Sequence, residues 1–322
     1  MTLRIGTRGS ALALVQARTV AALLKARTGT DCEIVVIKTS GDRMADARLS
    51  EIGGKGLFVK EIEEALLAGT IDLAVHSSKD MPAQIPDGLE VRATLPREDP
   101  RDALVLPAPA ESMPFDDAVR RLGASPRVGT SSVRRVAQLT ALLPQAQFVP
   151  FRGNLDTRLR KLDQGDVDAI VLAAAGLRRL EQAGRISAFV PADACVPAPG
   201  QGIVAIEIRE GDDDVRRAVE PINDAVTSAA LQAERAVVET LGGGCQTPVG
   251  ALVSPGYPDE IELLAVVVSL DGSRAIYGMA HGMRDEAAAI GARVGAQLLA
   301  DGAGEILAEA GRAMGTVEGT QP

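Results

Sequence analysis

The sequence predicts an α/β protein made of two lobes and a smaller third domain. Strand-like and helix-like segments alternate along the first two thirds of the chain, which is typical of sheets covered by helices. Two Pro-containing linkers, at residues 96–100 and 191–202, indicate that the chain leaves the first lobe and later returns to it. From about Pro221 the order changes to a helix, two strands and another helix, which indicates a separate domain with antiparallel pairing.

These changes divide the chain into three predicted domains. Domain 1 comprises residues 1–97 and 198–220, domain 2 residues 98–197, and domain 3 residues 221–322. Because the chain crosses twice between domains 1 and 2, we expect a ligand to bind in a cleft between them.

Domain 1 begins with short apolar runs that predict strands, at residues 3–6, 32–39 and 71–75. Between these runs, apolar residues recur at helical spacing. They are Leu12, Val15, Ala22 and Leu23 in the first predicted helix, and Phe58, Ile62, Ala65 and Leu66 in the second. Alternation of this kind predicts a parallel sheet covered by helices.

A polar segment at residues 40–56 ends in Gly53-Gly54-Lys55-Gly56. Glycine runs bind phosphate in nucleotide-binding loops, but the spacing G-x-x-x-x-G-K-S/T is absent here. A mobile lid and an irregular surface loop both fit this segment.

The alternation of strands and helices restarts in domain 2. Strands are predicted at residues 127–129, 148–151 and 168–173, helices at residues 131–143, 155–162 and 174–182, and a returning strand of domain 1 at residues 203–209. In domain 3 a helical stretch reaches Leu241, and the glycines of residues 242–244 follow it. Asp271-Gly272 then separates two apolar runs and predicts a hairpin, before an Ala-rich helix that begins near Asp285.

The composition excludes several classes of partner. A net charge of −9 and an aromatic content of 2% without Trp argue against nucleic-acid binding. No apolar run approaches the ~18 residues of a membrane span. Two histidines and three widely separated cysteines, Cys32, Cys195 and Cys245, offer neither metal-ligand spacing nor a disulfide framework. The N-terminus enters a strand without the apolar core of a signal peptide, so we expect a cytoplasmic protein without a bound metal.

Polar side chains follow the apolar run at residues 71–75. They are Ser77, Ser78, Lys79 and Asp80, and Pro82 ends the segment. Open α/β sheets bind ligands at the carboxyl ends of their strands, so this segment is a candidate site. A solvated loop with an ordinary Lys-Asp pair is the alternative.

Three further strand-to-helix junctions combine small or hydroxyl residues with arginine: Thr7-Arg8-Gly9-Ser10, residues 129–135, and Arg152-Gly153-Asn154. Free backbone N–H groups and the helix dipole at such junctions bind carboxylate or phosphate. N-capping explains any single junction, but three of them in two lobes favour a multiply anionic ligand. Among so many cations we expect Asp80 to stay ionised and to stabilise positive charge as it develops.

Cys245 follows three glycines, which allow close approach of the backbone and give the thiol room. The alternative is a small residue in a glycine turn, because isolated cysteines are usually inert. Its reactivity does not follow from spacing.

Taken in this order, the motifs resemble those of the porphobilinogen deaminase family, also called hydroxymethylbilane synthases. The resemblance covers nearly the whole chain. It is carried by residues 5–13, 53–58, 75–80, 129–135, 152–158 and 243–248, the last of which has the sequence Gly243-Gly244-Cys245-Gln246-Thr247-Pro248.

The resemblance implies two lobes similar to type II periplasmic binding proteins and a small α/β third domain. It implies a transferase of tetrapyrrole and heme biosynthesis, which joins four porphobilinogen molecules head to tail with loss of ammonia and releases hydroxymethylbilane by hydrolysis. The chain would grow on a dipyrromethane cofactor attached to Cys245 by a thioether. Residues 40–56 would match a mobile loop over the cleft.

The family's motif positions also imply roles for individual residues. Asp80 would be catalytic, holding pyrrole N–H groups and stabilising the cationic azafulvene that forms as ammonia leaves. The residues expected to bind the cofactor, besides Cys245, are Lys79, Ser77, Thr130, Ser132, Arg134, Arg135 and Gly153. Those expected to bind substrate are Arg8, Ser10, Phe58, Arg152, Arg158 and Arg179. The helical spacing of Phe58 equally fits core packing.

Two other functions fit parts of the pattern. A solute receptor would share the two lobes, but it would need neither Asp80 nor a third domain bearing Cys245. An enzyme acting on a phosphorylated metabolite would use the helix N-termini and the glycine run, but neither a metal-binding carboxylate cluster nor phosphate-loop spacing supports it. We expect porphobilinogen as the small-molecule partner and a monomeric protein.

Overall fold

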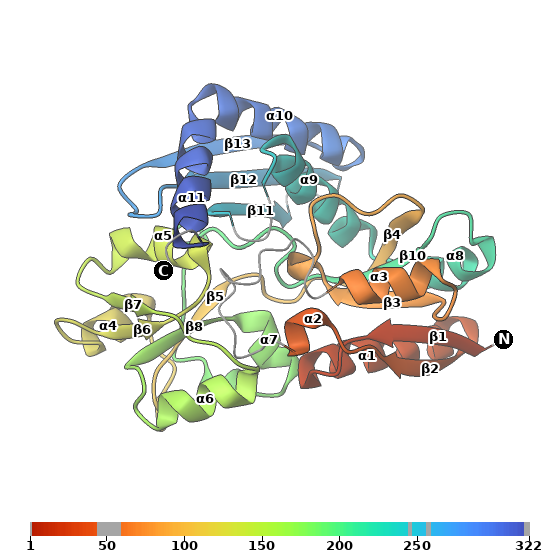
Figure 1. The fold of residues 1–322 in the computed structure, drawn as a ribbon, viewed down its shortest axis with the longest axis horizontal. Helices are drawn as coiled ribbons and strands as arrows, with labels where there is room; N and C mark the ends of the chain where they lie inside the picture. Colours follow the sequence, from red (N-terminus) through yellow and green to blue (C-terminus); the bar gives the residue numbers. More distant parts are fainter. Residues whose placement is uncertain (1, 44–58, 244–246, 256–258, 319–322) are drawn as a thin grey trace.

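The computed structural model describes residues 2–43, 59–243, 247–255 and 259–318. It contains three sheets, and Figure 1 shows them as three α/β units around a central region. The first unit is drawn mainly in red and orange, with β10 and α8 in teal, the second in yellow and green, and the third in teal and blue. The predicted α/β class, with a separate antiparallel sheet at the C-terminal end of the chain, is confirmed.

The first sheet has the strand order β2-β1-β3-β10-β4. Its strands are β1 (Thr2–Thr7), β2 (Asp31–Val36), β3 (Leu73–Ser77), β4 (Leu89–Thr94) and β10 (Val204–Arg209). β1 is parallel to β2 and β3, whereas β10 is antiparallel to both β3 and β4. The predicted parallel arrangement of β1, β2 and β3 is therefore confirmed. β10 runs in the opposite direction because the chain re-enters this sheet from the second unit.

Helices cover both faces of the first sheet. Val20 and Leu24 of α1 (Ala11–Thr28) pack against one face with Leu73 and Val75 of β3. On the other face, Ile62 and Leu66 of α3 (Lys60–Leu67) pack against Ala74. Alternate residues of β3 therefore point to opposite helices, as the two-residue period of a strand requires. The short helices α2 (Ser40–Arg43) and α8 (Asp213–Val219) complete this unit.

The second sheet repeats this arrangement with the strand order β7-β6-β8-β5-β9. Its strands are β5 (Asp102–Val105), β6 (Arg127–Gly129), β7 (Gln147–Val149), β8 (Ala169–Ala173) and β9 (Ala188–Phe189). Its helices are α4 (Phe115–Arg121), α5 (Val133–Leu142), α6 (Leu155–Asp163) and α7 (Ala174–Arg179). β6 is parallel to β7 and β8, and β5 is antiparallel to β8 and β9.

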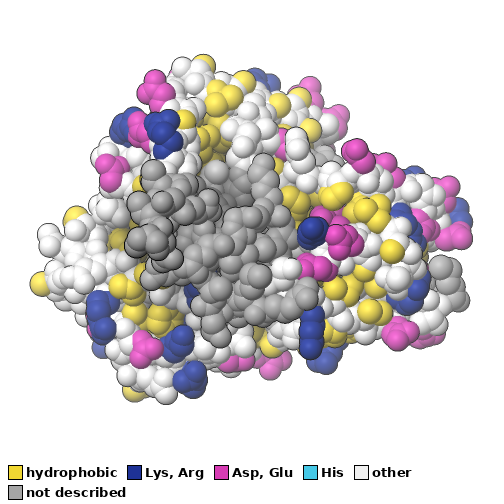
Figure 2. All heavy atoms as spheres, in the orientation of Figure 1, with side chains coloured by type: hydrophobic (Ala, Val, Ile, Leu, Met, Phe, Trp, Pro, Cys, Tyr) yellow, Lys and Arg dark blue, Asp and Glu magenta, His cyan; other side chains and the backbone are white. Residues whose placement is uncertain are grey.

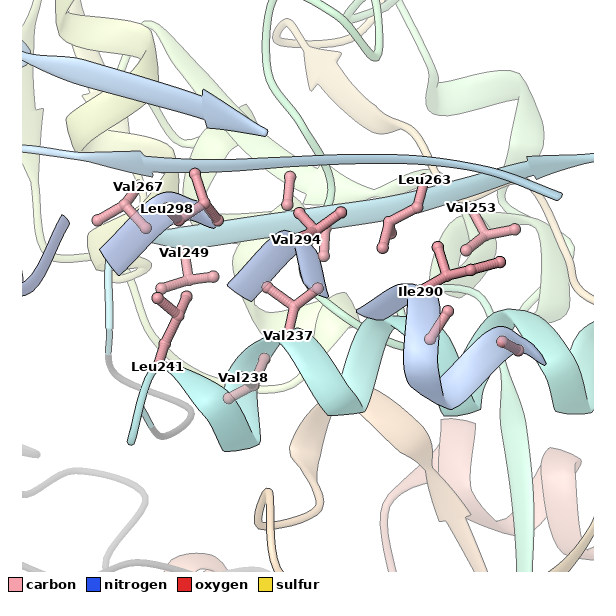
Figure 3. Close-up of a cluster of buried hydrophobic side chains, with 14 of the residues drawn as sticks. Val237, Val238, Leu241, Val249, Val253, Leu263, Val267, Ile290, Val294 and Leu298 are labelled. Atoms are coloured by element: carbon pink, nitrogen blue, oxygen red, sulfur yellow. The ribbon is translucent and has the colours of Figure 1, made fainter. Parts of the chain in front are cut away.

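The third sheet is antiparallel and consists of β11 (Val249–Pro255), β12 (Glu260–Val268) and β13 (Ala275–Met283). The predicted turn at Asp271-Gly272 joins β12 to β13, and Gly272 has a φ of 70°. α9 (Ala225–Thr240), α10 (Ala287–Ala300) and α11 (Ala303–Glu318) complete the unit. Figure 3 shows its core, in which Val237, Leu263 and Val294 come from α9, β12 and α10.

α10 lies close against α9 because glycine faces that helix. A Cβ atom at Gly291 would lie 2.1 Å from the carbonyl oxygen of Ala233, so only glycine permits this approach. Figure 1 shows α10 at the top of the view, and α9 is in contact with it.

Glu234 of α9 lies fully buried where the third unit meets the first. It accepts hydrogen bonds from Arg97 Nη1 at 2.5 Å, Gly200 N at 2.7 Å and Val253 N at 2.8 Å. One carboxylate thereby joins both chain crossings, at Arg97 and Gly200, to β11 of the third sheet. The exact division into domains at residues 97/98, 197/198 and 220/221 stays a prediction.

On the face drawn in Figure 2, the described Lys and Arg side chains are interspersed with Asp and Glu. Among the described residues, no helix combines the length and apolar character needed to cross a membrane. In the same part of the chain, His, Cys, Asp and Glu side chains form no group of three or more that could hold a metal ion.

Candidate functional site

The candidate site begins where β3 ends. Ser77 is the last residue of β3, and Ser78–Asp80 form one turn of 3₁₀-helix that is closed by a hydrogen bond from Met81 N to Ser78 O at 3.1 Å. Ser78 N also donates to Ile203 O at 3.0 Å, which fixes the turn to the crossing that leads into β10. The turn places Lys79 and Asp80 at the carboxyl end of a central strand, as the sequence predicted.

Asp80 lies in the wall of a pocket of about 410 Å³, which we call the aspartate pocket. Its polar lining residues are Arg8, Ser10, Gln16, His76, Ser77 and Asp80. The structure thus brings together three residues that the resemblance assigned to substrate or cofactor, Arg8, Ser10 and Ser77, around the predicted catalytic carboxylate.

Gln16 is a pocket residue that the sequence analysis missed. It lies on the buried face of α1, and its Nε2 lies 2.9 Å from Ser77 Oγ. A polar residue on the apolar face of a predicted helix was the available signal, because buried polar groups need a partner.

A second pocket, of about 600 Å³, lies where all three units meet, and we call it the junction pocket. The first unit contributes Ser78 and Lys79, and the second contributes Ser132 and Arg134. The third unit contributes Arg235 and Thr247. Ser78 Oγ is buried there and has no hydrogen-bond partner among the described residues.

Arg134 and Arg135, at the start of α5, share one buried carboxylate. Arg134 Nη2 donates to Asp102 Oδ2 at 2.7 Å, and Arg135 Nη2 donates to Asp102 Oδ1 at 2.8 Å. Burial opposes ionisation of Asp102, but the two arginines hold its pKa well below the usual range. Asp102, the first residue of β5, was also missed, because no motif marked it in the sequence.

Other N–H groups of these two arginines donate hydrogen bonds to backbone carbonyl oxygens. Arg134 Nη1 donates to Val196 O at 2.8 Å, and Arg135 Nη1 donates to Val171 O at 3.0 Å. Arg134 Nε is buried and has no hydrogen-bond partner among the described residues. The two arginines and Asp102 together carry a net charge of about +1 that is held rigidly in place. Most of the N–H groups of the arginines already donate hydrogen bonds within the protein.

Lys79, Asp80 and Arg158 form an electrostatic cluster that joins the two lobes. Burial lowers the pKa of Lys79 to about 8, against the opposing charge of Asp80. Burial and the charge of Arg135 lower the pKa of Arg158 to about 10, again opposed by Asp80. Arg158 Nε is buried without a hydrogen-bond partner among the described residues. Crowded, half-buried cations are suited to hold an anion.

Two of the predicted helix-start hydroxyls, those of Ser10 and Ser132, act as N-caps. Ser10 Oγ accepts from Ala13 N at 3.3 Å, and Ser132 Oγ accepts from Arg135 N at 3.4 Å. Thr130 Oγ1, which is buried, accepts from Ser132 N at 3.3 Å. The capping alternative thus describes part of their role, although Ser10 and Ser132 also line the two pockets.

Other predicted residues lie in varied settings. Gly153 has a φ of 115°, and a Cβ there would lie 2.9 Å from Thr157 Cγ2, so glycine is required before α6. Arg179 Nη2 donates to Gly202 O at 2.7 Å and so joins α7 to the second chain crossing. Arg152 is half-buried just before Gly153. Phe58 and Cys245 lie outside the described residues.

The family models agree with the resemblance. The family model "Porphobilinogen deaminase, dipyromethane cofactor binding domain" matches residues 3–217, and "Porphobilinogen deaminase, C-terminal domain" matches residues 229–300. Among solved structures, a periplasmic binding protein of Salmonella typhimurium matches with 11% identity and a TM-score of 0.38, over 70% of this chain and 93% of that one.

Curated relatives match over nearly their whole length. Porphobilinogen deaminase of Syntrophus aciditrophicus is 46% identical over 308 residues, which cover 95% of this chain and 98% of that protein. Porphobilinogen deaminase of Bordetella parapertussis is 49% identical over 309 residues, which cover 95% of this chain and 96% of that protein. The chain therefore belongs to the porphobilinogen deaminase family, the transferases that condense porphobilinogen stepwise into hydroxymethylbilane with loss of ammonia.

Proposed function

We propose that the aspartate pocket and the junction pocket together form the site of this condensation, with Asp80 as the catalytic carboxylate. The observation that carries the proposal is the position of Asp80, in the wall of one pocket and electrostatically coupled to Lys79 and Arg158. Lys79 lines the other pocket, so the two sites meet at this turn.

Asp80 accepts hydrogen bonds from pyrrole N–H groups and stabilises the positive charge that develops as ammonia leaves. A carboxylate fixed at the end of β3 does not have to reorient during the reaction, and a preorganised charge of this kind is more effective than one supplied by water.

The cations bind the carboxylates of substrate and growing chain. Each pyrrole of porphobilinogen carries an acetate and a propionate, so every condensation adds two anionic groups. The Nε atoms of Arg134 and Arg158, which are buried and have no hydrogen-bond partner within the described residues, support this assignment, because buried guanidinium donors are normally hydrogen-bonded. Arg8, Ser10, Arg152, Arg158 and Arg179 are assigned to substrate, and Phe58 is assigned to contacts with the pyrrole rings.

The family's N-terminal domain binds a dipyrromethane cofactor, and the residues of the junction pocket fit it. Lys79, Arg134 and Ser132 offer cations and a hydroxyl. The buried Ser78 Oγ, which has no hydrogen-bond partner in the described part of the chain, could bind a ligand group. Ser77, Thr130, Arg135 and Gly153 complete the proposed binding set. When bound, dipyrromethane supplies the pyrrole carbon to which the first substrate unit is joined.

We assign the covalent attachment to Cys245, through a thioether. Thr247, two residues further along the chain, lines the junction pocket, which supports this choice. Cys195 is buried among Arg134 and Asp102, and burial raises the pKa of its thiol to about 12, so it is a poor nucleophile.

The proposal also covers the domain division, the cellular location and the oligomeric state of the enzyme. We propose that the three predicted domains correspond to the three sheets and that the protein works as a cytoplasmic monomer. Light scattering of the purified protein measures the oligomeric state directly, and a stable dimer would contradict this part.

The first test is the intact mass of the denatured protein beside a Cys245→Ser variant. We expect the wild-type chain to carry the added mass of two pyrrole units and the variant to lack it. An unmodified wild-type preparation is then incubated with porphobilinogen, and failure to gain the adduct would overturn the assignment of Cys245.

A further inference from the structure

Behind the aspartate pocket lies a buried group of three titratable side chains. His76 of β3 and Glu207 of β10 lie on the same face of the first sheet, because Ala74 pairs with Glu207 and His76 with Ala205. They are diagonal neighbours on antiparallel strands, a position from which side chains reach each other. His76 Nε2 lies 3.1 Å from Glu207 Oε2, and both side chains are almost fully buried.

Glu63 of α3 completes the group. α3 covers this face of the sheet, and Glu63 lies on its buried side with Ile62 and Leu66. Burial and the charge of Glu207 raise the pKa of Glu63 to about 7, against the smaller opposing effect of His76. Glu63 Oε1 and Glu207 Oε1 have no hydrogen-bond partner among the described residues.

Besides Glu207 and His76, the charged groups that act on Glu63 lie on α9 and on α3 itself. Arg235 of α9 opposes the rise of its pKa, and Glu64 on the same helix adds to it slightly. Arg4 of β1 is paired with Asp72, and Arg209 of β10 donates to the carbonyls of Leu66 and Ile71. The charge state of Glu63 therefore depends mainly on burial and on Glu207.

His76 connects this group to the candidate site, because it lines the aspartate pocket beside Ser77 and Asp80. The charge of the group thus lies directly behind the wall that faces the substrate. A negative charge added there repels an anionic ligand through protein, where screening by water and salt is weak.

We propose that His76, Glu207 and Glu63 form a buried titratable cluster that sets the charge behind the substrate pocket, with Glu63 as a positioning residue for the anionic substrate. The inference rests on the proposed function of the aspartate pocket. Glu63 touches no reacting atom, and it acts through His76 on the affinity for the carboxylates of porphobilinogen.

The expected consequence is a pH-dependent KM. Below about pH 7 Glu63 is protonated and neutral, and above it the carboxylate adds one negative charge to the buried wall. We expect the KM for porphobilinogen to rise about threefold through this step, as an estimate for one partly buried charge near the ligand. The kcat should change little, since Glu63 touches no reacting atom.

The experiment compares steady-state kinetics of the holoenzyme from about pH 6 to about pH 9 for the wild type, Glu63→Gln and Glu64→Gln. Glu64 is exposed on the same helix, so its variant is the matched control. We expect Glu63→Gln to abolish the KM step near neutrality and Glu64→Gln to keep it. A wild-type profile in Glu63→Gln would overturn the inference.

A second measurement on the wild type keeps the inference testable if Glu63→Gln does not fold. The chain has two histidines, His76 and His281, so imidazole NMR signals are assigned with a single His281→Asn variant. We expect the His76 signal to show a step that follows the titration of Glu63. A signal without that step would overturn the inference.

The inference and the proposed function fail in different ways. If Asp80→Asn abolishes turnover while Glu63→Gln leaves the KM profile unchanged, only the buried cluster is wrong. If Asp80→Asn is fully active, the aspartate pocket is not the catalytic site and the inference falls with it.

Discussion

Arg134 Nη2 donates to Asp102 Oδ2 at 2.7 Å in the interior of the second lobe. Asp102 also accepts from Arg135 and from Gln201 Nε2, so one carboxylate organises two adjacent arginines and the second chain crossing. The arginines that the family motif assigns to cofactor binding are therefore rigid before any ligand arrives. Preorganised cations bind anions without first having to become ordered.

Replacing Asp102 with Asn should destabilise the protein strongly. Two buried arginines would lose their shared counter-charge, and breaking a buried pair costs roughly 3–5 kcal/mol. Urea unfolding measures the change in the free energy of unfolding. The control is Asp117→Asn, which removes an exposed pair with Arg120 and should cost at most about 1 kcal/mol. Equal effects of the two substitutions would contradict the structural role of Asp102.

Replacing Asp80 with Ala should leave the fold intact and nearly abolish product formation. The carboxylate is half-buried in a pocket wall, so its loss removes charge stabilisation without opening the core. We expect a decrease in kcat of about 100-fold or more. Asp87→Ala, which changes an exposed carboxylate in the segment after the turn, is the control and should retain activity. Full activity of Asp80→Ala would remove Asp80 from the mechanism.

Lys79 should produce an alkaline limb in the pH profile of substrate binding. Because burial lowers the pKa of Lys79 to about 8, the side chain loses its charge above that pH, and anionic ligands should then bind more weakly. In Lys79→Arg the charge persists, so the rise in KM above about pH 8 should disappear. Lys60→Arg changes an exposed lysine and should keep the limb. If the KM of Lys79→Arg still rises in this pH range, another titrating group causes the rise.

The same shift has a consequence for stability. Between about pH 8 and the ordinary value of 10.5, the unfolded chain binds a proton at Lys79 that the native chain does not bind. Stability therefore rises with pH across that window as far as this group contributes. Unfolding of the wild type and Lys79→Met at several pH values measures the difference.

Replacing Arg158 with Ala should raise the KM for porphobilinogen about tenfold, which corresponds to the loss of one charge-assisted hydrogen bond. Its buried Nε has no hydrogen-bond partner among the described residues, so removing this atom deprives no acceptor group of those residues of its hydrogen bond. Arg160→Ala alters an exposed arginine on the same helix and should leave the KM unchanged. An unchanged KM in Arg158→Ala, with normal cofactor content, would exclude Arg158 from ligand binding.

The local pattern of the sequence was sufficient to locate most central elements. Residues 127–129 were predicted as a strand and form β6, and the predicted helix at residues 155–162 forms α6 at Leu155–Asp163. The strands β4 and β5 were missed, because proline-containing segments lie beside them. The direction of β10 and β5 was also missed, since pairing direction depends on how the chain returns rather than on the composition of the strand.

The residues of the candidate site also fall into those that the sequence located and those that only the structure revealed. The sequence by itself located the turn at residues 77–80, the arginines at the helix starts and the family to which they belong, because these features depend on contiguous residues. Asp102, Gln16 and the group of His76, Glu207 and Glu63 became recognisable only in the tertiary structure. Each of them acts through a partner distant in the chain, such as Asp102 with Arg134 or Gln16 with Ser77. The energy of a buried charge is set by the surrounding packing, and packing between distant segments is decided only when the chain folds.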